Sequence, residues 1–158
     1  MQYSDYKKAR DSVDGELERL VAGGMLTEAE AQAVDKKSIS AFFKSELAER
    51  IFKSEKVYKE YAFTASVPLS EMNPEIPAEA STGECVIIEG VADCAFVENG
   101  SLVIVDYKTD RAQNGEELAQ RYKEQLSVYR RCLAEVIGLP VSQTLIYSFR
   151  LGEIIEVE

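Results

Sequence analysis

The chain has 158 residues, a length that fits one domain with a real hydrophobic core. Its net charge of −10 argues against a domain that grips nucleic acid by its overall charge. The excess acid lies in residues 61–100, which hold seven acids and no Lys or Arg, so the remainder is nearly balanced and leaves room for a local basic path. Three cysteines without CxxC spacing are typical of reduced thiols in a cytoplasmic protein, and the absence of histidine excludes a histidine base or ligand within this chain.

No targeting segment is expected. The first ten residues are polar and charged, unlike a cleavable signal. No apolar run approaches the roughly 18 to 20 residues that a membrane helix needs. These features predict a cytoplasmic protein without a membrane partner.

The N-terminal part, residues 1–56, is predicted to be helical and to pack on a core formed by residues 57–158. Apolar residues recur at helical spacing over 3–22 and again over 38–53. Between these helices, Thr27 and Glu30 have the spacing of a capping box that opens a short helix.

The second part alternates between strands and one long helix. Strand patterns cover 57–67, 85–97, 102–110, 143–149 and 153–157, a polar loop covers 68–84, and a helix covers 116–137. This order predicts an α/β domain in which a small mixed β-sheet is flanked by helices.

The dipeptide Asn99-Gly100 between two apolar runs predicts a hairpin with a two-residue type I′ turn. In that register, opposed residues sum to 199, so Asp93 lies opposite Asp106. Alternation places Lys108 on the same face as Asp106. The neighbours expected on this face are apolar, which predicts a half-buried site: Ile87, Val91, Val97, Leu102 and Ile104.

Two opposed carboxylates are destabilising unless something compensates their charge. Lys108 supplies one positive charge, and a hard divalent cation such as Mg²⁺ would supply the rest. Two acids, a lysine and a metal are the groups used in phosphodiester hydrolysis. The alternative is a set of surface ion pairs on a solvated strand. Glu60, at the start of the strand over 57–67, is either a third acid at the site or an exposed strand end.

The 116–137 helix carries polar residues beside its apolar stripe. Gln125 falls inside the stripe, between Tyr122 and Tyr129, and a polar side chain there needs a partner. It is either a core glutamine bonded to backbone, with tyrosines that pack, or part of a Gln–Tyr pair that points at the carboxylate site. Arg121 lies at the edge of the stripe.

Three segments together resemble one known family: Gly-Val-Ala-Asp at 90–93, Leu-Val-Ile-Val-Asp-Tyr-Lys-Thr-Asp at 102–110 and Tyr-x-x-Gln-Leu-x-x-Tyr at 122–129. They resemble the RecB-like branch of the PD-(D/E)XK nucleases, and in particular the nuclease domain of AddA from the bacterial ATP-dependent helicase/nuclease. The stretches at 24–27, 41–46 and 59–60 are similar to that domain as well, so the resemblance covers nearly the whole chain.

The resemblance implies a restriction-endonuclease-like core and a role for each matched residue. Asp93, Asp106 and the backbone carbonyl of Tyr107 would ligate Mg²⁺, with Mn²⁺ as a substitute. Lys108 would be the catalytic lysine, and Gln125 and Tyr129 an auxiliary motif.

The resemblance also implies a setting. Members are machines that unwind and degrade double-stranded DNA ends for homologous recombination repair, with exonuclease activity on the unwound strand. Their partner is a second, AddB-like nuclease subunit.

Two departures qualify this expectation. The chain has no GxxxxGK[ST] phosphate loop, so it is expected to be a fragment of a larger helicase/nuclease or a stand-alone relative. The histidine that the family carries upstream on a helix is also absent, which predicts an incomplete metal site. Two alternatives follow: an inactive nuclease-fold module that binds DNA ends or a partner subunit, and a different RecB-like nuclease, although such relatives carry a cysteine cluster that this spacing lacks.

Overall fold

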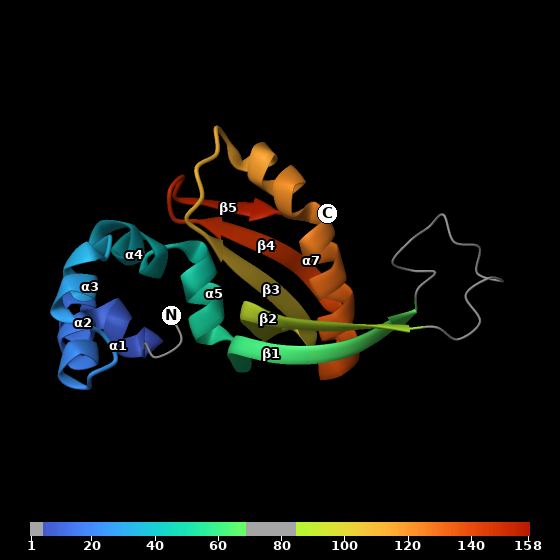
Figure 1. The fold of residues 1–158 in the computed structure, drawn as a ribbon, viewed down its shortest axis with the longest axis horizontal. Helices are drawn as coiled ribbons and strands as arrows, with labels where there is room; N and C mark the ends of the chain where they lie inside the picture. Colours follow the sequence, from blue (N-terminus) through green and yellow to red (C-terminus); the bar gives the residue numbers. More distant parts are fainter. Residues whose placement is uncertain (1–4, 69–84) are drawn as a thin grey trace.

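The computed structural model describes residues 5–68 and 85–158, in which a five-stranded mixed sheet lies between helices (Figure 1). The strands, in their order across the sheet, are β1 (Lys56–Pro68), β2 (Cys85–Glu98), β3 (Ser101–Lys108), β4 (Val141–Ser148) and β5 (Glu153–Glu156). The helices are α1 (Tyr6–Asp11), α2 (Val13–Ala22), α3 (Glu28–Ala33), α4 (Lys36–Phe43), α5 (Glu46–Lys53) and α7 (Gly115–Ile137). The α/β class and the helical N-terminal third are confirmed, and the loop predicted at 68–84 lies, apart from Pro68, outside the described residues.

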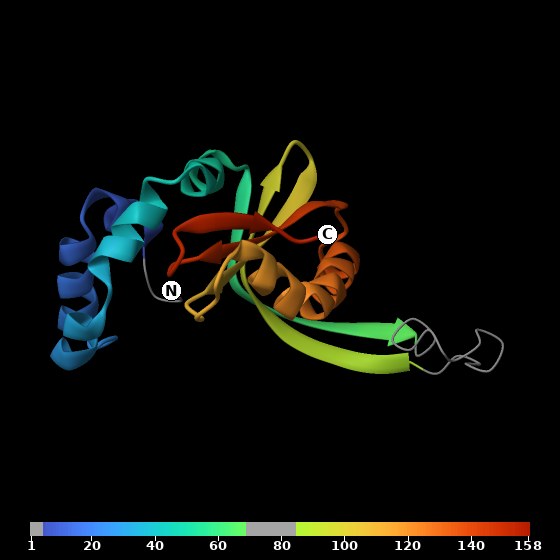
Figure 2. The same ribbon diagram turned by 90° about the horizontal axis from the view of Figure 1, so that it is seen from above.

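Helices cover both faces of the sheet. In β3, Leu102 and Ile104 are buried toward α7, whereas Val103 and Val105 are buried toward the N-terminal helices, where Phe42 of α4 is fully buried. Figures 1 and 2 show α7 across one face and α5 beside the other. The helical part therefore shares a core with the sheet. No described helix is long and apolar enough to cross a bilayer.

The predicted hairpin is present. Asn99 has φ 52° and Gly100 has φ 75°, the positive values that a type I′ turn requires. Cross-strand pairs run from Glu98–Ser101 to Cys94–Val105, so opposed residues sum to 199 as expected. The β3–β4 pair is parallel, and α7 is the crossover connection that such a pair needs.

Two predicted helices are each divided into two. The helix expected over 3–22 breaks at Ser12, whose backbone is extended and whose hydroxyl accepts from Gly15 N–H at 3.0 Å. The helix expected over 38–53 breaks at Ser45, whose hydroxyl accepts from Ala48 N–H at 3.2 Å. Serine is more favourable at the N-cap of a helix, where its hydroxyl accepts from a free N–H group, than in a helix interior. This preference divides each helix at its serine although the apolar spacing continues.

Ser45→Ala tests this division of the helices. Ser45 also donates a hydrogen bond to the carbonyl oxygen of Phe42 at 2.6 Å, so the variant removes two bonds at the turn. We expect the free energy of unfolding in urea to fall by about 1 kcal/mol. Ser127→Ala, an exposed change within α7, is the control and should stay within about 0.5 kcal/mol. Equal losses in both variants would contradict the capping role.

Candidate active site

The C-terminal end of β3 holds an acid and a lysine on the face that α7 covers. Asp106 continues the alternation of Leu102 and Ile104, and it is buried, with 7% of its surface exposed. Lys108 Nζ lies 2.7 Å from Asp106 Oδ2, as expected for two residues on one face of a strand. The contact is an ion pair, and apart from it Asp106 Oδ2 has no hydrogen-bond partner among the described residues.

Burial and charge act on this pair in opposite directions. Burial raises the pKa of Asp106 above its usual value, although the Lys108 ammonium works to lower it and Asp93 adds to the rise. Burial also works to lower the pKa of Lys108, but contact with Asp106 holds that pKa above its usual value. Lys108 therefore carries its positive charge at neutral pH. The oxygen Oδ2 of the buried Asp106 has this ammonium as its one close partner among the described residues.

Asp93 reaches the same place from β2. Regular pairing with β3 ends at Cys94–Val105, one position before the two aspartates. There the Asp93 carboxylate accepts a hydrogen bond from Tyr107 N–H at 2.8 Å. The predicted register is confirmed as far as Cys94–Val105. The Asp93–Asp106 pair expected next is not part of the ladder, and the Asp93 side chain is held by Tyr107 N–H instead.

The alternation of β2 changes at Asp93. Ala92 and Ala95 are both buried toward α7, which a regular strand cannot do because they differ by an odd number of residues. The position on β1 that faces Asp93 is Glu60, with φ 47°, and the ladder skips this pair while continuing on both sides. Glu60 therefore lies beside Asp93 at a local irregularity, and the interpretation as a plain strand end is wrong.

This change corrects one expectation from the sequence. Ile87 and Val91 were predicted on the face of the carboxylates, but they are 61% and 48% exposed. They precede the irregularity, so the odd-numbered residues there point to the opposite face. The other three residues predicted there, Val97, Leu102 and Ile104, are buried toward α7 as expected.

Of the four candidate residues of helix α7, Tyr122 contacts the site and Tyr129 packs against β1 and β2. The Tyr122 ring lies under Lys108, with Nζ 4.1 Å from the ring centroid. Tyr129 packs edge-on against Phe63 at 5.1 Å, and a Cβ placed on Gly90 would come within 3.1 Å of its hydroxyl. The same Cβ would come within 2.7 Å of the Phe63 ring, so the close approach of Phe63 and Tyr129 together explains the glycine at position 90.

The other two residues of α7 lie differently from the expectation. Gln125 is exposed, so the interpretation as a buried core glutamine is wrong. Arg121 is exposed as well and forms an ion pair with Glu117 one turn earlier. Its guanidinium also contacts the carbonyl oxygen of Arg111 at 3.4 Å, so it stabilises the start of α7.

A polar cluster behind the site was not found from the sequence. The Tyr107 hydroxyl lies 3.5 Å from that of Tyr6 on α1, and the Cys94 thiol lies beside them. Burial raises the pKa of Cys94 to about 12 and that of both tyrosines well above the usual value, so all three stay neutral. This cluster anchors Tyr107, whose main chain holds Asp93. Tyr6 lies on the predicted helical stripe, but nothing in that spacing indicated its partner.

The geometry agrees with a comparison across known proteins. The family described as the PD-(D/E)XK nuclease superfamily matches residues 3–152. The chain belongs to the PD-(D/E)XK nuclease superfamily.

The PD-(D/E)XK chain is also similar to larger proteins. It is 36% identical over 157 residues to the AddA subunit of the ATP-dependent helicase/nuclease of Acetivibrio thermocellus and 34% identical over 159 residues to that of Ruminiclostridium cellulolyticum. The match to the Clostridium botulinum protein of the same name is 33% over 160 residues. These matches cover 98–100% of this chain but 12–13% of the relatives.

The donor set of this PD-(D/E)XK site fits a divalent cation. Mg²⁺ takes one or two carboxylates together with water and substrate phosphate, and the buried, unsatisfied Asp106 Oδ2 beside Asp93 offers that set. Within 5–68 and 85–158, no group of three or more acidic, cysteine or histidine side chains gathers around one point.

A metal titration followed by thermal unfolding tests this fit without any activity. Mg²⁺ or Mn²⁺ should raise the melting temperature in a saturable way, by about 5–10 °C when the ion is near 100 times its dissociation constant. Asp106→Asn should abolish the rise. Glu49→Gln, which removes an exposed acid of α5, should preserve it. An equal rise in all three proteins would mean that the ion binds elsewhere.

Proposed function

We propose that this domain hydrolyses DNA phosphodiester bonds in a Mg²⁺-dependent reaction, with Mn²⁺ as a substitute, and acts as an exonuclease. The observation that carries the proposal is the buried Asp106, whose Oδ2 lacks a hydrogen bond while Lys108 lies 2.7 Å away. A buried acid without full compensation is costly in a purely structural role, and it is the arrangement expected where a cation and a phosphate complete the charges.

Asp93 and Asp106 would hold the ion, with the backbone carbonyl of Tyr107 as a further ligand. When bound, the ion polarises a phosphoryl oxygen and lowers the pKa of a bound water. The protein's part is to fix both carboxylates: Asp93 through Tyr107 N–H, and Asp106 through burial in β3. Glu60, which faces Asp93 across β1 and β2, would be an auxiliary acid.

Lys108 would act on the phosphate as a cation. Its pKa is raised by contact with Asp106, so in this state it offsets developing negative charge rather than removing a proton. The Tyr122 ring supports the ammonium at 4.1 Å and limits its movement. Gln125 and Tyr129, the auxiliary motif, would contact the substrate from α7, and the exposure of Gln125 leaves its amide accessible to a ligand.

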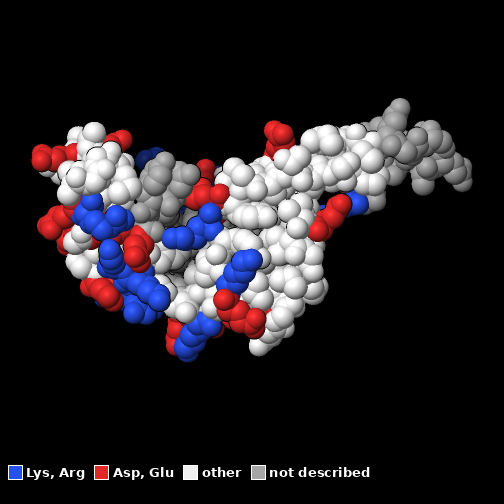
Figure 3. Space-filling view, turned by 90° about the horizontal axis from the view of Figure 1, so that it is seen from below, with Lys and Arg blue, Asp and Glu red and all other residues white. Residues whose placement is uncertain are grey.

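The surface around the domain bears on how DNA would reach the site. Figure 3 shows Lys and Arg side chains gathered, together with acids, over the N-terminal helices and beside the hollow between these helices and the sheet. With a net charge of −10, such local patches would guide a strand only weakly. We therefore infer that other parts of a larger machine supply most of the DNA contact.

Because this chain is similar to part of the AddA helicase/nuclease, we propose that the larger machine unwinds double-stranded DNA ends for homologous recombination repair in the cytoplasm. This domain would receive a single strand produced by unwinding, and its partner would be an AddB-like second subunit. The alternative is a catalytically inactive module that binds DNA ends or a partner subunit; it is favoured by the small number of carboxylates at the site.

A cleavage assay separates these two functions. Linear single-stranded and double-stranded DNA is incubated with the protein in Mg²⁺, in Mn²⁺ and in EDTA. Cleavage should require the ion, and Asp106→Asn and Lys108→Met should each lower the rate about a hundredfold or more. The first removes a ligand of the ion, and the second removes a positive charge beside the reacting phosphate.

Lys44→Met is the matched control, since Lys44 is an exposed lysine at the end of α4. It should retain the wild-type rate. Cleavage that persists in both site variants would contradict the assignment. DNA binding without any cleavage in either ion would favour the inactive module.

A further inference from the structure

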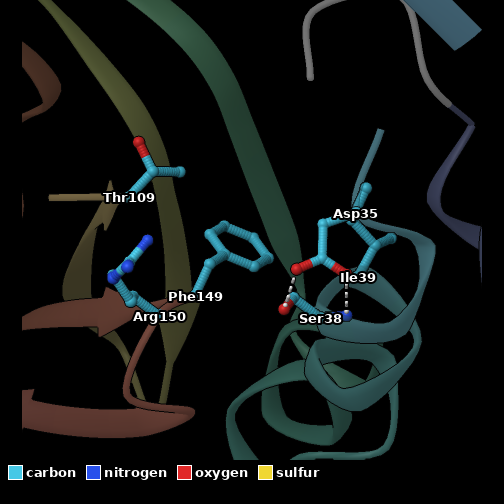
Figure 4. A pocket seen from close by; sticks show the side chains of 6 residues that line it. All are labelled: Asp35, Ser38, Ile39, Thr109, Phe149 and Arg150. Carbon is cyan, nitrogen blue, oxygen red and sulfur yellow. Dashed lines mark hydrogen bonds between the residues drawn. The ribbon is translucent and has the colours of Figure 1, made fainter. Parts of the chain in front are cut away.

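A pocket of about 380 Å³ opens between α4 and the ends of β3 and β4 (Figure 4). Its lining is Asp35, Ser38 and Ile39 from the N-terminal side, and Thr109, Phe149 and Arg150 from the sheet side. The volume lies within the roughly 300–1,000 Å³ of pockets that bind small molecules. It is far too small for a duplex, so any nucleic acid inside it must be a single unpaired nucleotide.

The pocket adjoins the candidate active site. Phe149 N–H donates to the carbonyl oxygen of Lys108 at 2.9 Å, and Thr109 is the next residue after Lys108. Asp106 and Lys108 point toward α7, whereas Phe149 belongs to the aromatic layer on the opposite face. A strand that crosses the ends of β3 and β4 would thus have a phosphate on one side and a base on the other.

Phe149 provides a stacking surface that is fixed in place. Its ring contacts those of Phe42, Tyr107 and Tyr147 at centroid distances of 5.8, 5.8 and 5.0 Å. These contacts hold one side of the ring, and Figure 4 shows the ring projecting into the space toward Asp35. Aromatic rings of this kind stack on nucleobases without regard to sequence.

The charges at the rim favour a base in the pocket over a phosphate. The Asp35 carboxylate accepts from Ser38 N–H at 3.1 Å and from the Ser38 hydroxyl at 2.7 Å. These bonds keep Asp35 ionised, so it would repel a phosphate but could accept from the amino group of a base. On the other side of the pocket, Arg150 is exposed and has no ion pair within the described residues. The turn that carries Arg150 is closed by a hydrogen bond from Leu151 N–H to Ser148 Oγ at 3.2 Å.

We propose that this pocket holds one unpaired base of the DNA strand next to the cleaved phosphate. The base stacks on Phe149, and Arg150 contacts the phosphate at its rim. This inference rests on the proposed function, because it assumes a DNA strand at Asp106 and Lys108. It specifies a single-stranded substrate and gives the helical N-terminal part a direct role in binding.

The inference is tested by removing single bases from the DNA and, separately, by filling the pocket in the protein. Single-stranded oligonucleotides, each with one abasic position, are titrated with the 158-residue chain in EDTA at low salt, and binding is followed by fluorescence anisotropy. One position should stand out, with affinity lowered about five- to 150-fold, the range for loss of one stacked base. In Ile39→Trp or Thr109→Trp, which fill the pocket, the effect at that position should disappear.

Arg150→Ala should lower affinity for all oligonucleotides alike, and Lys44→Ala, with the same loss of charge at the far end of α4, should have a smaller effect. Circular dichroism confirms that each variant is folded, and two filling variants guard against the loss of one.

The inference is overturned if no position stands out, if the same position stands out in both filling variants, or if no binding is measurable. Metal-dependent cleavage by the same preparation shows whether the proposed function stands independently. If one abasic position lowers the affinity but no cleavage is seen, the base pocket is supported and the proposed nuclease function is overturned.

Discussion

The contact between Asp106 and Lys108 at the end of β3 is the constraint on which the rest of this domain depends. A carboxylate that is 7% exposed and lacks a hydrogen bond at Oδ2 costs folding free energy, and one ammonium offsets only part of that cost. The surroundings hold the acid in place regardless. Apolar residues of β3 and α7 exclude water from one side, and the Tyr122 ring limits where Lys108 can move. The acid is thus placed before any ligand arrives, as electrostatic catalysis requires.

The two helical layers support this site in different ways. Helix α7 faces the charged side, and Phe63 and Tyr129 lie close to Gly90, where a larger residue would clash with the Phe63 ring first. On the other side, α1 and α4 surround the side chain of Tyr107, whose main chain holds Asp93. The N-terminal helices are therefore part of the site's support. The proposed base pocket would extend this role from support to contact with the substrate.

The sequence predicted what local chemistry determines. Asn99-Gly100 determined the hairpin, and the hairpin brought Asp93 to the end of β3, where Asp106 lies. It did not predict what depends on distant contacts or on small departures from regular geometry. The irregularity at Glu60 reverses the alternation of β2, so Ile87 is exposed where burial was expected. The partnership of Tyr107 with Tyr6 joins residues about a hundred positions apart, and no spacing in the sequence encodes it.

The most direct test of the account is the position of a bound ion. Crystals of the 158-residue chain soaked in Mn²⁺ would show it by anomalous diffraction. The account predicts one peak at about 2.0–2.3 Å from an oxygen of both Asp93 and Asp106, with Lys108 Nζ moved away from Asp106. A peak bound by other residues, or an Asp106–Lys108 contact that stays unchanged at saturating Mn²⁺, would contradict the claim that the buried acid is there to hold a metal.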